Sequence, residues 1–158
     1  MTINIKDGIL QPFTIRIVEQ ICQWEYEKPY DVYNFKGRSN EYLMDENTWG
    51  TEQFALCNDN IVIGQVAAQF DNNNLWVGWS LSPKLCGKGN GYIFIKKCTE
   101  EIRRIKAYKG RLYLRVATSN ERAIKAYQKA GFVYLETIQD EIAYSNNIED
   151  FWVMVLEN

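Results

Sequence analysis

The sequence contains no histidine, and its cysteines are widely spaced. No Cys-x-x-Cys pair occurs among Cys22, Cys57, Cys86 and Cys98. Zinc sites are built mainly from Cys and His ligands at short spacing, so we expect no metal centre of this kind. A histidine general base is excluded, and with it any Ser-His or Cys-His pairing.

Long apolar runs and basic blocks are also missing. Because no stretch approaches the ~18 apolar residues of a membrane helix, and no basic-then-apolar leader opens the chain, we expect neither membrane span nor signal peptide. The net charge of −2 disfavours electrostatic capture of nucleic acid or an anionic membrane. We therefore expect a reduced, cytoplasmic protein that binds neither of them.

The composition is that of an ordinary globular domain. The chain has 158 residues, of which 46% are hydrophobic and 24% charged, and no linker or repeat divides it. A single domain covering residues 1–158 is expected.

Hydrophobic periodicity predicts an α/β (α+β mixed) architecture, with a mixed, mostly antiparallel sheet of about seven strands flanked by four helices. The three strands in mid-chain should form an antiparallel meander, and the last two should pair antiparallel. The predicted strands cover residues 3–6, 53–57, 61–70, 75–81, 111–117, 132–139 and 151–156. The predicted helices cover residues 12–24, 40–49, the stretch from the glycine turn to Gly110, and 120–131.

The most informative segment is the glycine-rich turn LSPKLCGKGNGYIF, at residues 81–94. Its glycines, Gly87, Gly89 and Gly91, stand between a predicted strand and a predicted helix. Backbone amides at such a turn favour an anion, above all a phosphate. The spacing matches neither the G-x-G-x-x-G dinucleotide fingerprint nor the Walker motif. On this segment alone, a phosphate site and an ordinary flexible turn both remain open.

The turn resembles a signature of the GNAT superfamily of N-acetyltransferases. That signature reads Gln or Arg, two residues, Gly, one residue, then Gly or Ala. Gly89 and Gly91 fit it, whereas Cys86 stands where Gln or Arg is usual.

A second stretch strengthens the resemblance. Residues 120–132 read NERAIKAYQKAGF, and family members share an Asn, an Ala, a Tyr and a Gly-Phe pair at these spacings. The residues that match are Asn120, Ala123, Tyr127, Gly131 and Phe132. Helical spacing places the first three on one face.

The resemblance implies a GNAT-like fold that binds acetyl-CoA and transfers its acetyl group directly to a primary amine. Tyr127 is then the candidate general acid, with its hydroxyl near the cofactor sulfur, and Asn120 touches the cofactor. The strand end at Ser80, Leu81 and Ser82 would pair with the pantetheine arm, and a nearby amide would polarise the thioester carbonyl. The pyrophosphate would be held by the amides of Gly87, Lys88, Gly89, Asn90, Gly91 and Tyr92.

The general base and the acceptor stay open. The strand at 75–81 has no acidic residue, although many family members keep a Glu there. The candidate bases are Glu25, Glu27, Asp31 and Glu141, or a chain of water molecules. The aromatic and acidic segment after the first helix suits a cationic amine, with Trp24, Glu25, Tyr30 and Asp31 as candidate acceptor residues. Packing of this segment against the sheet is the alternative.

Two other functions remain open at this stage. A non-catalytic acetyl-CoA sensor fits the missing Glu and Cys86, whereas retention of Tyr127 favours an enzyme. A purely structural interaction domain leaves both motifs unexplained. The acceptor is expected to be a small-molecule or peptide amine, and exposed terminal strands would permit a homodimer.

Overall fold

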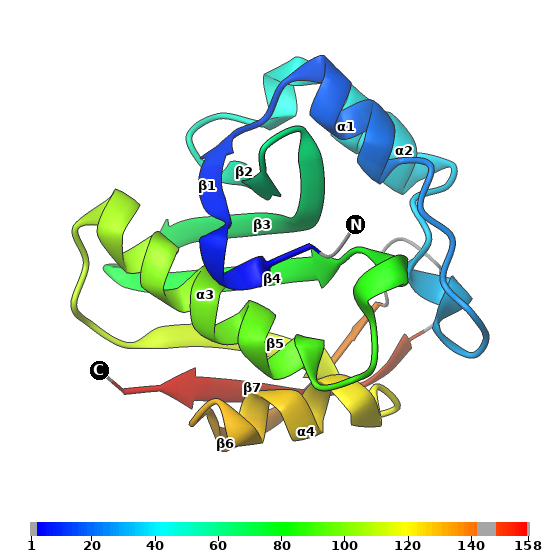
Figure 1. The fold of residues 1–158 in the computed structure, drawn as a ribbon. Helices are drawn as coiled ribbons and strands as arrows, with labels where there is room; N and C mark the ends of the chain where they lie inside the picture. The colour runs from blue at the N-terminus through cyan, green and yellow to red at the C-terminus, as the bar shows by residue number, and fades with distance from the viewer. Residues whose placement is uncertain (1–2, 142–147, 158) are drawn as a thin grey trace.

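A computed structural model describes residues 3–141 and 148–157. Its centre is a seven-stranded sheet in the order β1-β2-β3-β4-β5-β7-β6 (Figure 1). The strands are β1 Ile9–Pro12, β2 Gln53–Asn58, β3 Ile61–Asp71, β4 Asn74–Leu81, β5 Leu112–Ala117, β6 Val133–Glu141 and β7 Ile148–Leu156. The helices are α1 Ile15–Ile21, α2 Arg38–Met44, α3 Asn90–Lys106 and α4 Glu121–Lys129.

The topology confirms the predicted mixed sheet with four helices. Strands β2, β3 and β4 form the expected antiparallel meander, and β6 pairs antiparallel with β7. Only the contact between β4 and β5 is parallel among the described pairs. No helix of the described residues is both long and apolar enough to cross a membrane.

The prediction of a strand at residues 3–6 is wrong. The Asn4 side chain accepts a hydrogen bond from the Lys6 backbone N–H and caps a 3-10 turn at Ile5–Asp7. This local bond diverts the backbone, as Asn side chains commonly do, and the first strand forms later, at β1. The first helix is also shorter than predicted. Thr14 caps its start by accepting a bond from the Ile17 N–H, and the helix ends at Ile21.

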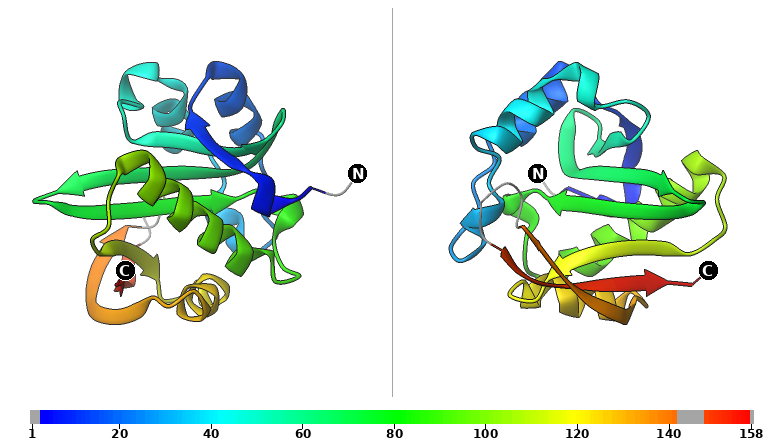
Figure 2. Two further views of the ribbon diagram at one scale, coloured as in Figure 1. Left: turned by 60° about the vertical axis from the view of Figure 1, so that its left-hand side comes forward. Right: turned by 180° about the vertical axis from the view of Figure 1, so that it is seen from behind.

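Helices cover both faces of the sheet (Figure 2). Side chains of β2 alternate between two apolar clusters, as the pleat of a strand requires. Phe54 and Leu56 join the cluster that contains α3 and α4, whereas Ala55 and Cys57 pack with α1 and α2. The larger cluster therefore sits under α3 and α4, where it supports the strands and helices around the site.

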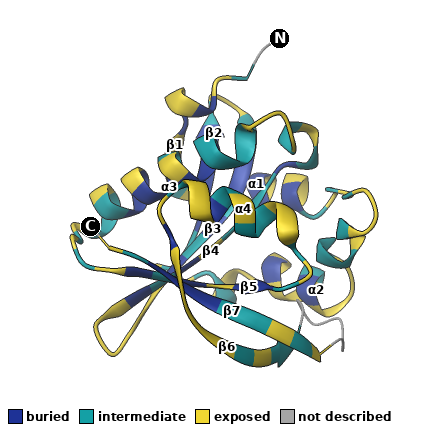
Figure 3. Cartoon of the chain, turned by 90° about the horizontal axis from the view of Figure 1, so that it is seen from below, coloured by how far each residue is buried: buried dark blue, intermediate teal, exposed yellow. Residues whose placement is uncertain are grey.

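The edge strand β6 is exposed along most of its length (Figure 3). Its apolar side chains Val133, Tyr134 and Leu135 are each more than half exposed. The other edge of the sheet is β1, which has only four residues.

Strands β4 and β5 separate soon after they meet. They are paired only at Leu75–Leu112 and Trp76–Tyr113. From Val77 to Leu81, β4 keeps β3 on one side, but β5 no longer pairs with it on the other. The divergence opens the sheet at the end where both strands lead into helices, and it leaves backbone donors and acceptors of β4 available.

Candidate active site

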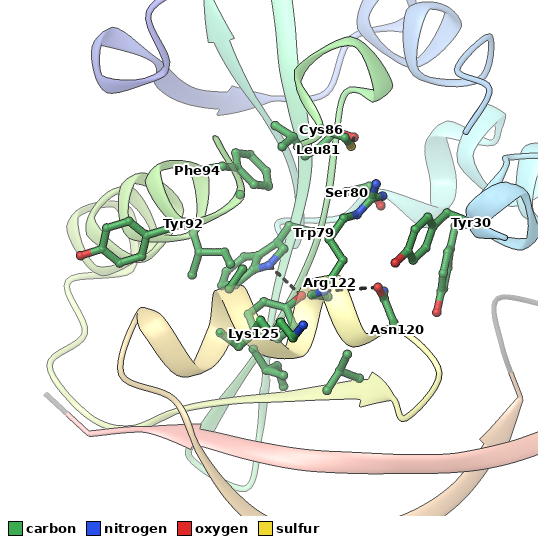
Figure 4. A pocket seen from close by; sticks show the side chains of 18 of the residues that line it. Tyr30, Trp79, Ser80, Leu81, Cys86, Tyr92, Phe94, Asn120, Arg122 and Lys125 are labelled. Atoms are coloured by element: carbon green, nitrogen blue, oxygen red, sulfur yellow. Dashed lines mark hydrogen bonds between the residues drawn. The ribbon is translucent and has the colours of Figure 1, made fainter. Parts of the chain in front are cut away.

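A cleft of about 510 Å³ occupies the space where β4 and β5 diverge (Figure 4). Its walls come from β4, β5, the start of α3, α4 and the segment between α1 and α2. Val77, Leu114 and Val116 are among its apolar lining residues, and Gly78 adds no side chain to the wall formed by β4. A slender, partly polar chain could lie along this edge and bond to its backbone.

Tyr127 and Trp79 form a hydrogen-bonded pair in the cleft. The Trp79 indole N–H donates to the Tyr127 hydroxyl oxygen over 3.0 Å (Figure 4). Burial raises the pKa of Tyr127, and the bond from Trp79 acts in the opposite direction. Since the indole N–H can only donate, the phenol keeps its own proton free for another partner. Trp79 packs edge-on against Phe94 and Phe132, which fixes the pair.

Trp79 was not predicted as a site residue. Its strand position was known, but nothing in the local pattern separates a core tryptophan from one that reaches a tyrosine 48 residues away. The one usable signal was its place on the strand that enters the glycine turn.

The glycine turn forms an open concavity. Gly87, Lys88 and Gly89 all have positive φ, at 81°, 58° and 77°, immediately before α3 begins. A Cβ on Gly87 or Gly89 would meet no atom within 4 Å, so the space before these residues is open. Successive backbone N–H groups in such a turn, next to a helix start, suit an anion. Together with the free edge of β4, the turn fits a diphosphate joined to a pantetheine arm.

The predicted cofactor residues fall into two groups. Those that line the cleft are Ser80, Leu81, Gly87, Gly89, Gly91, Tyr92, Asn120 and Tyr127. Ser82, Lys88 and Asn90 are not among the described lining residues. Ser82 is buried and its N–H donates to the Ile63 carbonyl, while the Asn90 side chain donates to the Leu85 carbonyl and braces the turn. Asn120 caps α4 by accepting from the Ala123 N–H over 3.3 Å.

Tyrosines from the segment between α1 and α2 close one side of the cleft. The Tyr26 hydroxyl donates to the Leu81 carbonyl oxygen at 2.7 Å, and burial raises the pKa of this phenol. The Tyr30 ring lies 3.8 Å from the Arg122 guanidinium carbon. Tyr33 also lines the cleft. All three tyrosines belong to the aromatic segment that was expected to contact an amine acceptor, and Tyr30 was one of its named candidate residues.

The remaining predicted acceptor residues lie elsewhere. Trp24 packs against the α1–α2 cluster, and Glu25 and Asp31 are exposed. None of the three is among the described residues that line the cleft. The segment turns its tyrosines inward, which leaves its acidic side chains at the surface. The candidate bases Glu27 and Glu141 are likewise outside the described lining.

All the charged side chains among the described lining residues are cations: Arg115, Arg122, Lys125 and Lys129. Arg115 forms an ion pair with Asp140, whereas no described carboxylate forms one with Arg122. The segment 142–147, outside the described residues, contains no acidic residue in its sequence. The cleft therefore presents positive charge to whatever it binds.

Metal ligands do not gather in the described part of the chain. No group of three or more Cys, Asp or Glu side chains there could hold an ion. The described cleft therefore offers hydroxyl groups, an indole, a thiol, a carboxamide, backbone amides and cations.

Comparison with known families gives a match over most of the chain. The profile described as "Acetyltransferase (GNAT) family" matches residues 18–132, which include β2 to β5, the glycine turn and the whole of α4. No curated protein sequence matches the chain significantly.

Solved structures share the fold at low sequence identity. The aminoglycoside acetyltransferase AAC(6')-Ib, in complex with ribostamycin and coenzyme A, is 16% identical with a TM-score of 0.73, over 96% of this chain and 94% of that one. An acetyltransferase of the GNAT family from Bacillus anthracis is 16% identical with a TM-score of 0.72, over 99% of this chain and 98% of that one. Spermidine N-acetyltransferase from Vibrio cholerae, in complex with CoA and spermine, is 18% identical with a TM-score of 0.72, over 96% of this chain and 95% of that one.

Proposed function

Because the chain belongs to the acetyltransferase (GNAT) family, we propose that it binds acetyl-CoA and transfers the acetyl group directly to a primary amine. The observation that carries the proposal is the bond between Trp79 and Tyr127, which positions a protonated phenol in the cleft between β4 and β5. A domain that only bound the cofactor would have no use for such a proton donor.

The chain offers separate features for each part of the cofactor. Around Ser80 and Leu81, the edge of β4 that β5 leaves unpaired would bond to the pantetheine arm through backbone groups that face away from β3. The amides from Gly87 to Tyr92 hold the diphosphate at the start of α3. When bound, acetyl-CoA supplies an activated acetyl group as a thioester. Asn120 lines the same cleft from α4.

Tyr127 acts as the proton donor to the leaving sulfur. In the transfer, the neutral amine nitrogen would bond to the acetyl carbon and lose one proton to water, while the carbon–sulfur bond breaks and the sulfur takes the bonding electrons. Tyr127 supplies a proton to that sulfur and regains one from solvent. Burial keeps the phenol protonated at neutral pH, while the Trp79 N–H stabilises the charge that forms on its oxygen.

Removal of the amine proton is left to water. No described carboxylate lines the cleft, so the amine must reach it already neutral or lose its proton to solvent. The rate should then rise with pH until the acceptor amine is unprotonated.

A second candidate is an acetyl-CoA sensor without catalytic activity. The lack of a described carboxylate in the cleft favours it, because a sensor needs no general base. The Trp79–Tyr127 pair favours the enzyme, which we rank first.

Titration calorimetry with acetyl-CoA, followed by thiol release with a panel of amines, tests the proposal. Binding with amine-dependent thiol release is the expected result. Binding without release for any amine would favour the sensor. No binding at all would remove both candidates.

A further inference from the structure

Arg122 lines the cleft and stacks on an aromatic ring from the segment between α1 and α2. Its guanidinium carbon lies 3.8 Å from the centre of the Tyr30 ring, a distance typical of cation–π stacking. Tyr30 belongs to the segment between α1 and α2, across the cleft from α4 (Figure 4). Stacking limits the movement of a long side chain and leaves the N–H groups at its edge free to donate.

Helix α4, which carries Arg122, packs beside the start of α3 where the glycine turn ends. Arg122, Ala126 and Lys129 are four and three residues apart and so share one face of α4. On that face, Ala126 is the nearest neighbour of Gly91, at 3.6 Å from a Cβ placed there, and Lys129 lies 4.7 Å above the Tyr92 ring. The face that carries Arg122 is therefore turned toward the first residues of α3.

A second observation agrees with this placement. Burial raises the pKa of the Cys86 thiol, and the charge of Arg122 opposes the rise. Cys86 immediately precedes the turn and has no charge of its own to offer an anion there. The guanidinium thus brings to the turn a positive charge that residue 86 does not supply.

The positive charge of Arg122 is not neutralised by a described carboxylate. No described carboxylate forms an ion pair with Arg122, whereas Arg115, which also lines the cleft, forms an ion pair with Asp140. A guanidinium with several free donors, held by a ring and aimed into a cleft, suits an oxyanion that can accept two bonds at once.

We propose that Arg122, held by Tyr30, binds the diphosphate of acetyl-CoA from the side opposite the glycine-turn amides. The inference rests on the proposed function and adds a specific consequence. Tyr30, on the segment expected to contact the acceptor, positions a cofactor-binding residue. The diphosphate lies between backbone amides of α3 on one side and a guanidinium from α4 on the other.

The test is calorimetry with CoA and with dephospho-CoA, which lacks the 3′-phosphate. Arg122→Gln should weaken the binding of both ligands equally, by roughly 10- to 100-fold, the loss expected for a charged hydrogen bond. Tyr30→Ala should weaken both several-fold, whereas Tyr30→Phe, which keeps the ring face, should not. Lys84→Gln is the matched control, because this exposed cation lies two residues before Cys86 and outside the described lining.

Three results would overturn the inference. A loss confined to CoA would place Arg122 on the 3′-phosphate. Unchanged affinity for both ligands, with only a higher acceptor KM, would place it on an anionic acceptor. Equal losses in Arg122→Gln and Lys84→Gln would indicate a general charge effect. If the wild-type protein itself binds neither ligand, the proposed function fails, which is a separate outcome.

Discussion

The hydroxyl of Tyr26 donates a hydrogen bond to the carbonyl oxygen of Leu81, 55 residues further along the chain, over 2.7 Å. Leu81 is the last residue of β4, where the strand has lost its neighbour β5. One bond thus fastens the segment that carries Tyr30 and Tyr33 to the strand end that borders the cleft.

Tyr26→Phe should loosen this segment over the cleft. The Leu81 carbonyl loses a partner, which costs about 1 kcal/mol of unfolding free energy. We expect the acceptor KM to rise several-fold with kcat nearly unchanged, measured by steady-state thiol release. Tyr134→Phe is the control, because it removes a tyrosine hydrogen bond on the exposed strand β6, outside the described lining. Equal KM values in the two variants would count against a positioning role for Tyr26.

Tyr127→Phe should lower kcat by about 100-fold, since general acid catalysis typically contributes at least that much. The ring still fills its buried site, so the affinity for CoA and the melting temperature should change little. Steady-state kinetics and calorimetry on the same preparation separate the two effects. Unchanged turnover with intact CoA affinity would remove the acid role. Trp79→Phe should have a smaller effect on kcat, because it deletes only the donor that assists the phenol.

Gly64→Ala should destabilise the fold by roughly 1–3 kcal/mol through overpacking. A Cβ at Gly64 on β3 would overlap the Phe94 ring and lie 3.0 Å from the Ser80 carbonyl oxygen. Urea denaturation gives the difference in unfolding free energy. Gly78→Ala, on the adjacent strand, is the matched control, because its Cβ meets no atom within 4 Å. Similar losses at both positions would show that close packing is not the cause.

Glu101 should make the free energy of unfolding decrease at acidic pH. This buried carboxylate accepts bonds from the Arg104 side chain and the Leu10 backbone, and the Arg104 bond is the main cause that lowers its pKa below the ordinary 4.5. A lowered folded-state pKa stabilises the protein above pH 4.5, and this contribution is lost as the pH falls through the folded-state value. Glu101→Gln should flatten that part of the stability curve.

Denaturant midpoints of the wild type and Glu101→Gln between about pH 3 and 7 check this prediction. The difference between the two proteins should be largest near neutrality, about 1 kcal/mol, and should shrink with acid. A difference that stays constant over this range would contradict the linkage. A substitution of Lys106, which bonds to the Thr51 carbonyl, offers a control at the same helix end.

Most of the fold could be predicted because the sheet and the long helices follow clear periodicity. The meander from β2 to β4 is as the spacing indicates, and the apolar side chains Ile95, Cys98 and Ile102 of α3 are buried. The strand predicted at residues 3–6 was wrong, because the Asn4 side chain caps a 3-10 turn there. The start of β7 at Ile148 rather than 151 reflects pairing with β6 that polar residues do not reveal.

The candidate site was predictable only where a motif fixes the backbone. The glycine turn and α4 bring Gly89, Asn120 and Tyr127 to one cleft, as the two motifs suggested. Contacts between distant segments were not predictable, because the sequence around Trp79 or Arg122 does not indicate which distant residue each side chain contacts. Composition suggested acids beside the aromatic residues, yet the fold turned the rings inward and the carboxylates outward.

The separation of β4 from β5 also has a mechanical consequence. Among the described residues, two backbone pairs at one end join the four-stranded half of the sheet to the three-stranded half. A ligand bonded along the free edge of β4 adds backbone contacts at this seam, much as an extra strand would. Hydrogen exchange at the seam should therefore slow when the cleft is filled, and the two halves should resist unfolding together rather than in turn.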